Sequence, residues 1–139
     1  MTDHNPRFAG MHFFVRDMKA ALAFYSLLGF EPSRSGDQFA HIDLPDGLFL
    51  EFGTYALTRG YDSGWTEPTG TGTNALQFRV SGRDAVDDLY ARIVAAGHIG
   101  RLAPFDAFWG ARYAEVRDPD GNVVGFHSPS DDALRTPPP

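Results

Sequence analysis

Hydrophobic and polar positions alternate in short runs along most of the chain, which is the pattern of half-buried strands. Residues 8–16 (FAGMHFFVR) show it first: Phe13 and Val15 fall on one face of the predicted strand, and His12 and Phe14 fall on the other. One face of each such strand is expected to pack on a core, which leaves the second face to contact the other half of the protein or a ligand.

Two runs break this alternation with apolar residues at helical spacing. The first is residues 18–29 (MKAALAFYSLLG), where Asp17 suits the helix N-cap and Gly29 suits the stop. The second is residues 83–97 (RDAVDDLYARIVAAG), which also ends on a glycine. The sequence therefore predicts two amphipathic helices, each following a strand.

Turn chemistry separates the remaining strands. In residues 113–127 the run DPDGN joins two strand-like segments, because proline presets φ, aspartate bonds nearby amides and Gly121 accepts a positive φ. Beyond this turn, Val124 and Phe126 share one face, and His127 lies on the other. The segment 45–47 (PDG) predicts a similar hairpin earlier in the chain.

The predicted order is strand, helix and three strands, given twice, so the fold class is α+β with a duplicated unit. We expect a first βαβββ module over residues 8–54 and a second over residues 74–129. Between them, residues 55–73 predict a long connecting loop, either a linker or a lid. Residues 1–7 form a short N-terminal segment, and the proline-rich residues 130–139 predict a disordered tail.

Composition limits the classes of partner and the chemistry that the protein can use. The net charge of -6 disfavours a nucleic-acid partner and is compatible with a cationic ligand. No apolar run approaches a membrane span and no leader precedes the first strand, so we expect a cytoplasmic protein without a membrane partner. The sequence has no cysteine, which excludes a thiol nucleophile and a thiolate metal site.

Three runs together, FFVRDMKAALAFYSLLGF, FRVSGRDAVDDLYARIVAAG and DPDGNVVGF, resemble the paired modules of the glyoxalase, bleomycin-resistance and extradiol-dioxygenase superfamily, also called vicinal oxygen chelates. The resemblance covers about residues 8–129. It implies two βαβββ modules that form a cupped mixed sheet, a small-molecule ligand in the cup and, usually, a homodimer. The two modules can pair within one chain or across a dimer.

The resemblance also places the four side chains with which metal-dependent members bind a divalent ion. Carried over by the flanking motifs, those positions are Gly10, Glu51, Ala75 and Gly125. Only Glu51 can ligate, and a Zn, Ni or Fe site needs at least three protein ligands, so we expect no metal and no other cofactor.

A displaced metal site is the alternative. His12, Gln77 and His127 each lie two residues beyond an empty position, and a shift of two residues restores the same face of a strand. With Glu51 they could hold Zn, Ni, Mn or Fe, one layer along the strands. The same four side chains could equally form a polar layer that hydrogen-bonds a ligand or water, which is the interpretation we favour.

Other residues suggest ligand contacts. Glu51 is a candidate general base if aromatic walls desolvate it, whereas pairing with an arginine would make it structural. Aromatic side chains that could stack on a flat ligand are Phe14, Trp65, Trp109 and Tyr113. His41 is interpreted as a surface histidine. The predicted ligand-binding residues are His12, Phe14, Glu51, Gln77, Trp109, Tyr113 and His127.

Two functions follow. The first is a metal-free protein that sequesters a small aromatic or cationic molecule, similar to bleomycin-resistance proteins. The second is an enzyme of the same superfamily, namely a metal-dependent lyase, isomerase, epimerase or dioxygenase. A metal-independent enzyme that uses Glu51 and His12 as an acid–base pair remains open. The absent ligands favour the first function.

Overall fold

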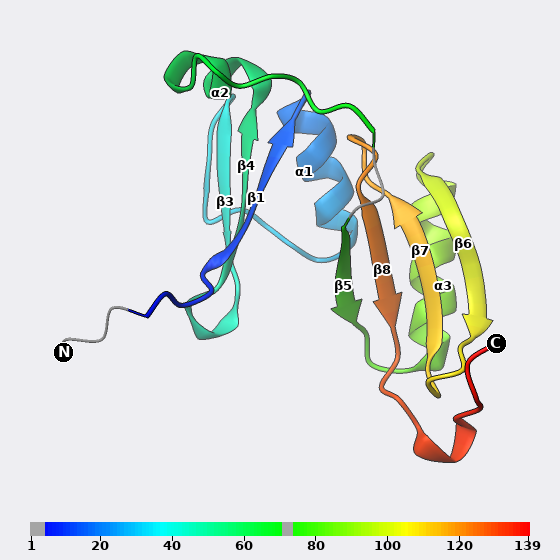
Figure 1. Ribbon diagram of the computed structural model, residues 1–139. Coiled ribbons are helices and arrows are strands. Elements are labelled where there is room, and N and C mark those ends of the chain that lie inside the picture. Colours follow the sequence, from blue (N-terminus) through cyan, green and yellow to red (C-terminus); the bar gives the residue numbers. More distant parts are fainter. Residues whose placement is uncertain (1–4, 71–73) are drawn as a thin grey trace. The chain divides into compact units, whose positions relative to one another are not determined.

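The computed structural model describes residues 5–70 and 74–139 and divides the chain into two compact units, Met1–Pro68 and Thr69–Pro139. Each unit contains a four-stranded mixed sheet and a helix that packs on it (Figure 1). The predicted α+β class and the repeated order of strand, helix and three strands are both confirmed. Residues 1–4 and 71–73, at the N-terminal segment and the end of the connection, lie outside the described residues.

The sheet of the first unit has the strand order β1-β4-β3-β2. β1 runs parallel to β4, and β3 runs antiparallel to both β4 and β2. Its elements are β1 (Gly10–Val15), α1 (Met18–Leu27), β2 (Arg34–Ser35), β3 (Phe39–Asp43), the short 3-10 turn η1 (Pro45–Gly47) and β4 (Phe49–Thr54).

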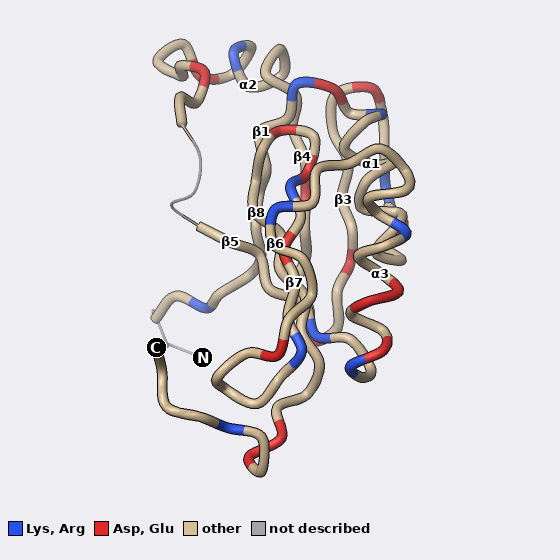
Figure 2. Tube along the Cα trace, turned by 90° about the vertical axis from the view of Figure 1, so that its right-hand side faces the viewer, with Lys and Arg blue, Asp and Glu red and all other residues tan. Residues whose placement is uncertain are grey.

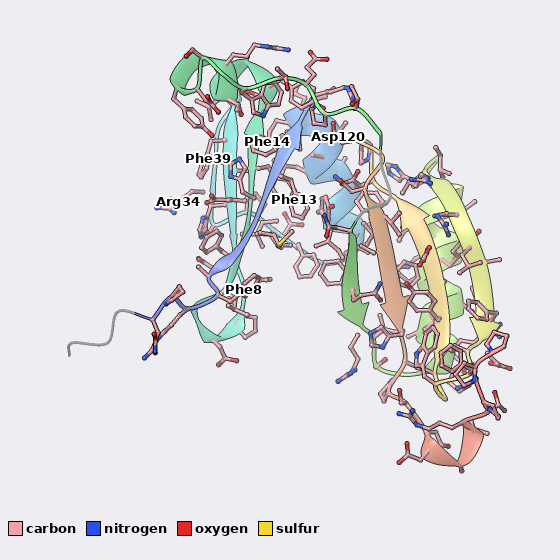
Figure 3. All side chains as sticks on the ribbon, viewed as in Figure 1. Phe8, Phe13, Phe14, Arg34, Phe39 and Asp120 are labelled. Carbon is pink, nitrogen blue, oxygen red and sulfur yellow. The ribbon has the colours of Figure 1, made fainter. Side chains whose placement is uncertain are left out.

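The core of this unit lies between the sheet and α1. Phe13 of β1 stacks on Phe52 of β4 and on Tyr25 of α1, with ring centroids 5.4 and 6.1 Å apart respectively. Phe24 is also fully buried. The neighbouring Phe14 projects from the opposite side of β1, away from α1 (Figure 3). The period-2 pattern of the sequence therefore separates a covered face from an open one, as predicted.

Both ends of α1 follow the predicted chemistry. The Asp17 carboxylate accepts hydrogen bonds from the backbone N–H groups of Lys19 and Ala20, which otherwise have no partner inside the helix. Gly29 takes a φ of 88°, the left-handed conformation that ends helices and costs glycine least.

The second unit repeats the plan with the order β5-β8-β7-β6. Its elements are β5 (Ala75–Arg79), α3 (Arg83–Ala95), β6 (Ile99–Asp106), β7 (Arg112–Arg117) and β8 (Val123–His127). α3 covers one face of this sheet and buries Val86, Leu89 and Ile93 (Figure 1). The sharp turn between β7 and β8 is the predicted one: the buried Asp118 accepts from the backbone of Asp120 and Asn122.

Two predicted segments differ in the structure. The connection 55–73 opens with the helix α2 (Tyr55–Tyr61), because the Thr54 hydroxyl accepts from Leu57 N–H and caps a helix that buries Tyr55. The second segment is residues 130–139, for which the sequence predicts a disordered tail. That segment contains the 3-10 turn η2 (Asp132–Leu134), and Asp131 N–H donates to the Gly110 carbonyl.

Charge is spread over both units. Acidic and basic residues are interspersed along the chain, including along α3, rather than collected by sign in one element (Figure 2). None of the helices in the described parts of the chain is long and apolar enough to cross a bilayer.

Candidate functional site

A row of polar side chains crosses the open face of the first sheet. His12 of β1 and His41 of β3 both lie opposite Glu51 of the central strand β4 in the strand register. The two oxygens of the Glu51 carboxylate are divided between them: Oε1 lies 3.0 Å from His12 Nδ1 and Oε2 lies 3.3 Å from His41 Nδ1. His41 Nε2 continues the chain to Asp43 at 3.2 Å. We call His12, Glu51 and His41 the first polar row.

The hydrogen bond to Glu51 sets the tautomer of the neutral His12 ring. An ionised carboxylate only accepts, so Nδ1 of the neutral ring carries the proton and Nε2 carries the lone pair. Nε2 is buried and has no hydrogen-bond partner among the residues that the structure describes. Polar atoms in such a position usually have a partner. This acceptor is therefore the unusual atom of the row.

Aromatic rings adjoin the first polar row. His12 meets Phe14 edge to face at 5.0 Å, Phe14 lies 5.7 Å from Trp65, and Trp65 lies 4.9 Å from Tyr55, all measured between ring centroids. The guanidinium of Arg59 lies over Trp65 at 5.3 Å and pairs with Glu67. The connection after β4 is thus folded back and packed on the open face beside His12.

The second unit carries the corresponding row. Gln77 of β5 and Glu115 of β7 both lie opposite Gly125 of the central strand β8. Because the central residue has no side chain, the phenol of Tyr113 lies over it. Gln77 Nε2 donates to the Tyr113 hydroxyl at 2.9 Å, and that hydroxyl donates to Glu115 Oε2 at 2.7 Å. Arg101 then donates to the other oxygen of Glu115 at 2.7 Å.

This environment holds the Tyr113 phenol protonated. Burial is the main cause that raises its pKa to about 12, since the phenolate would lose its hydration. The adjacent Glu115 acts in the same direction because it accepts the phenolic proton, whereas the hydrogen bond from Gln77 opposes them. Tyr113 is therefore a fixed neutral donor at any physiological pH.

The other predicted residues of this unit lie close by. Trp109 meets Tyr113 edge to face at 5.2 Å, and the His127 ring lies 6.3 Å from Tyr113. His127 Nδ1 lies 3.3 Å from the Ser128 carbonyl oxygen. Gln77, Trp109, Tyr113 and His127 are thus grouped in the second unit, whereas His12, Phe14 and Glu51 are grouped in the first. The ligand-binding role of each residue stays a prediction.

The four positions that the resemblance assigns to a metal do not fit one. A Cβ on Gly10 would lie 2.1 Å from the Phe49 carbonyl oxygen, and a Cβ on Gly125 would lie 2.4 Å from the Tyr113 hydroxyl. Ala75 offers no donor atom. Within residues 5–70 and 74–139, no group of three or more histidine, aspartate or glutamate side chains is placed to hold a metal ion.

Sequence reasoning missed His41. The sequence predicts a surface histidine at this position, yet its side chain is only 13% exposed and shares the Glu51 carboxylate with His12. The missing information was the pairing of β3 with β4, which decides the face that His41 occupies. The alternation of His41 with the buried Ala40 and Ile42 was the available signal.

The repeated order of elements and the polar row on each sheet define a protein of two βαβββ modules. The model of the Glyoxalase/Bleomycin resistance protein/Dioxygenase superfamily matches residues 7–126, and the chain belongs to that superfamily. The comparison with curated proteins gave no match.

Solved structures show the same fold. A glyoxalase-related enzyme from Fulvimarina pelagi is 22% identical with a TM-score of 0.78, over 88% of each chain. A glyoxalase/bleomycin resistance protein/dioxygenase family enzyme from Burkholderia phytofirmans PsJN is 26% identical with a TM-score of 0.76, over 86% of this chain and 96% of that one. Lactoylglutathione lyase from Agrobacterium tumefaciens is 19% identical with a TM-score of 0.65, over 91% and 96%.

Proposed function

We propose that this protein binds a small organic molecule without a metal ion, in the manner of the sequestering members of its superfamily. The observation that carries the proposal is the filled state of the metal positions. At Gly10 and Gly125 the space for a ligand side chain is taken by Phe49 and Tyr113 respectively. Without three side-chain ligands a divalent transition metal is not retained.

The chemistry of the two units supports a ligand with an aromatic ring. Each polar row is bordered by rings, Phe14 and Trp65 in the first unit and Trp109 in the second. Aromatic side chains bind flat molecules by stacking, and a few fixed polar atoms set the orientation. A homodimer belongs to the same proposal because the resemblance implies it, and the cytoplasmic location expected from the sequence belongs to it as well.

A second candidate is an enzyme, favoured by one observation. His12 holds Glu51 by a 3.0 Å hydrogen bond, and an oriented carboxylate next to an imidazole is an arrangement that moves protons. In the metal-dependent form of this candidate, His12, Glu51, Gln77 and His127 would hold Zn, Ni, Mn or Fe for a lyase, isomerase or dioxygenase reaction. In the metal-free form, Glu51 would act as the general base.

Metal analysis distinguishes the metal-free binding protein from the metal-dependent enzyme. The purified protein is incubated with Zn, Ni, Mn or Fe(II), desalted and measured by inductively coupled plasma mass spectrometry, beside His12→Ala and the control His98→Ala. We expect far less than one ion per chain in all three proteins. One ion per chain in wild type and His98→Ala, lost in His12→Ala, would establish the metal-dependent enzyme instead.

A ligand screen tests the binding function itself. Aromatic and cationic antibiotics are added in a thermal-shift assay, because a ligand that binds only the folded protein raises its melting temperature. At a hundred times its Kd, a ligand adds about 2.7 kcal/mol to the free energy of unfolding, which is a shift of several degrees. A screen without any stabilising compound would contradict the sequestration proposal.

A further inference from the structure

The segment that follows α2 is held on the first unit by very few contacts. We call residues 62–68 the strap; with α2 it lies at the end of the sheet where β1 and β4 finish (Figure 1). Trp65 is its only residue that is not exposed. No backbone group of the strap bonds to a strand of the described structure, because its hydrogen bonds are local and run from Trp65 and Gly64 N–H to Asp62. Side chains therefore hold the strap in place.

The indole of Trp65 rests on aromatic rings of the first unit. Its centroid lies 5.7 Å from that of Phe14, which projects from the open face of β1, and 4.9 Å from that of Tyr55 at the start of α2. Phe14 is still 37% exposed, so the indole covers only part of this ring. The contact is a stacking surface that one ring of the chain already occupies.

Arg59 of α2 binds the strap at two points. Its guanidinium lies over the Trp65 indole at 5.3 Å from the centroid, and it forms an ion pair with the Glu67 carboxylate. Both side chains of the pair are largely exposed, at 51% and 56%, and exposed pairs of this kind are weak. The strap thus offers an aromatic ring and a carboxylate to a partner made of rings and a guanidinium, and it is held there loosely.

We propose that Phe14, Tyr55 and Arg59 form a binding site for a flat aromatic carboxylate, and that the strap occupies this site in the free protein. The ligand's ring replaces the Trp65 indole on the two aromatic side chains, and its carboxylate replaces that of Glu67 on Arg59. The inference rests on the proposed small-molecule function. It names the chemical class of the ligand and the segment of the chain that yields to it.

Competition with the strap sets the affinity. A tethered segment acts at an effective concentration in the millimolar range, and a ligand binds only to the fraction of molecules in which the site is open. A small molecule that carries ring and carboxylate in one body loses less conformational freedom on binding than a chain segment does. Weakening the strap should therefore strengthen the binding of the ligand.

The carboxylate is tested with indole-3-propionate and its neutral amide, which share ring and shape. Isothermal titration calorimetry should show that the acid binds at least about threefold more tightly. In Arg59→Gln this preference should disappear. Arg135→Gln is the matched control, because Arg135 also pairs with an exposed carboxylate but lies in the second unit. Equal affinities for acid and amide, or a preference that survives in Arg59→Gln, would overturn the proposal.

Variants of the strap test the competition. Trp65→Ala should tighten the binding of indole-3-propionate about threefold to tenfold, and Glu67→Gln about twofold to fivefold. Thr66→Ala, an exposed position between them, should leave it unchanged. Wild-type affinity in both variants refutes the site, as does the absence of binding to Trp65→Ala. If Trp65→Ala does not fold, Glu67→Gln decides alone, because it changes only an exposed ion pair.

Displacement of the strap is observed with 5-fluorotryptophan. The protein has two tryptophans, and Trp65→Phe assigns their ¹⁹F lines. Saturation with indole-3-propionate should move the Trp65 line toward its position in the urea-unfolded protein, where the indole is in water. A Trp65 line that keeps its position at saturation means that the ligand binds elsewhere, which contradicts the proposal.

Failure of this site and failure of the proposed function have different signatures. If a compound from the thermal-shift screen stabilises the protein while the Trp65 line keeps its position, the small-molecule function stands and this site is wrong. If indole-3-propionate displaces Trp65 but the metal analysis finds one ion per chain, the site stands and the metal-free function is wrong.

Discussion

Replacing Gly125 by alanine is the most direct test of the second polar row. The new Cβ would lie 2.4 Å from the Tyr113 hydroxyl, about 1 Å inside the contact distance of a carbon and an oxygen. Gln77 lies at 2.8 Å but ends a flexible side chain, so it can move away. The rigid phenol has to leave its place and lose its hydrogen bond to Glu115.

The expected loss in the free energy of unfolding follows from the overpacking and from the lost hydrogen bond. Overpacking a tight site costs about 1–3 kcal/mol, and a hydrogen bond to a charged group contributes about 1.5–3 kcal/mol, part of which the displaced phenol regains elsewhere. We therefore expect Gly125→Ala to lower the free energy of unfolding by about 2–4 kcal/mol. The melting midpoint should fall by roughly 5–15 °C.

A double-mutant cycle with Tyr113→Phe assigns the cost to the phenol. Without the hydroxyl the collision disappears, so Gly125→Ala should cost less than about 1 kcal/mol in that background. Unfolding in urea is followed by the fluorescence of Trp109, which contacts Tyr113, in a Trp65→Phe background. Gly36→Ala is the control, because its nearest neighbour is 3.9 Å away. An equal cost with and without the hydroxyl would refute the reasoning.

Three other predictions follow from single side chains. Asp118→Ala should lower the free energy of unfolding by about 2–4 kcal/mol, because the buried carboxylate accepts three hydrogen bonds within its turn, and urea unfolding measures the loss. The pKa of Tyr113 is about 12 in the folded protein against 10.0 for a free tyrosine, so its contribution to the free energy of unfolding is complete below pH 10 and is lost as the pH rises toward 12. The urea midpoint of the wild type should therefore approach that of Tyr113→Phe over this pH range. Gly60→Ala in α2 should stabilise the protein by about 0.5–1 kcal/mol, since no atom crowds the new methyl group, and an unchanged or lower midpoint in thermal denaturation would argue against a formed α2.

Local chemistry made most of the fold predictable. Alternation identified the covered face of β1, Asp17 and Gly29 marked the ends of α1, and the residues from Asp118 to Asn122 formed the expected turn. These signals act within a few residues of the chain. The helix α2 was harder to predict, because its Thr54 cap precedes a segment rich in glycine, threonine and proline, a composition typical of loops.

The candidate site was less predictable because it depends on register between strands. The sequence predicts that Glu51 and His12 point to the same open face, but it predicts a surface position for His41, because the face of that residue depends on the pairing of β3 with β4. Likewise, no sequence pattern indicates that the Tyr113 ring lies over Gly125, since the two residues belong to different strands. Contacts of this kind follow from tertiary packing, which one sequence does not encode in any local period.

The two polar rows differ in which strand supplies the carboxylate. In the first unit the central strand supplies the carboxylate, Glu51, and imidazoles flank it. In the second the central residue is glycine, the carboxylate of Glu115 lies on the neighbouring strand, and the Tyr113 phenol bridges the row. Each carboxylate oxygen is already bonded to a protein group, so a metal ion would have to displace those bonds before gaining a ligand.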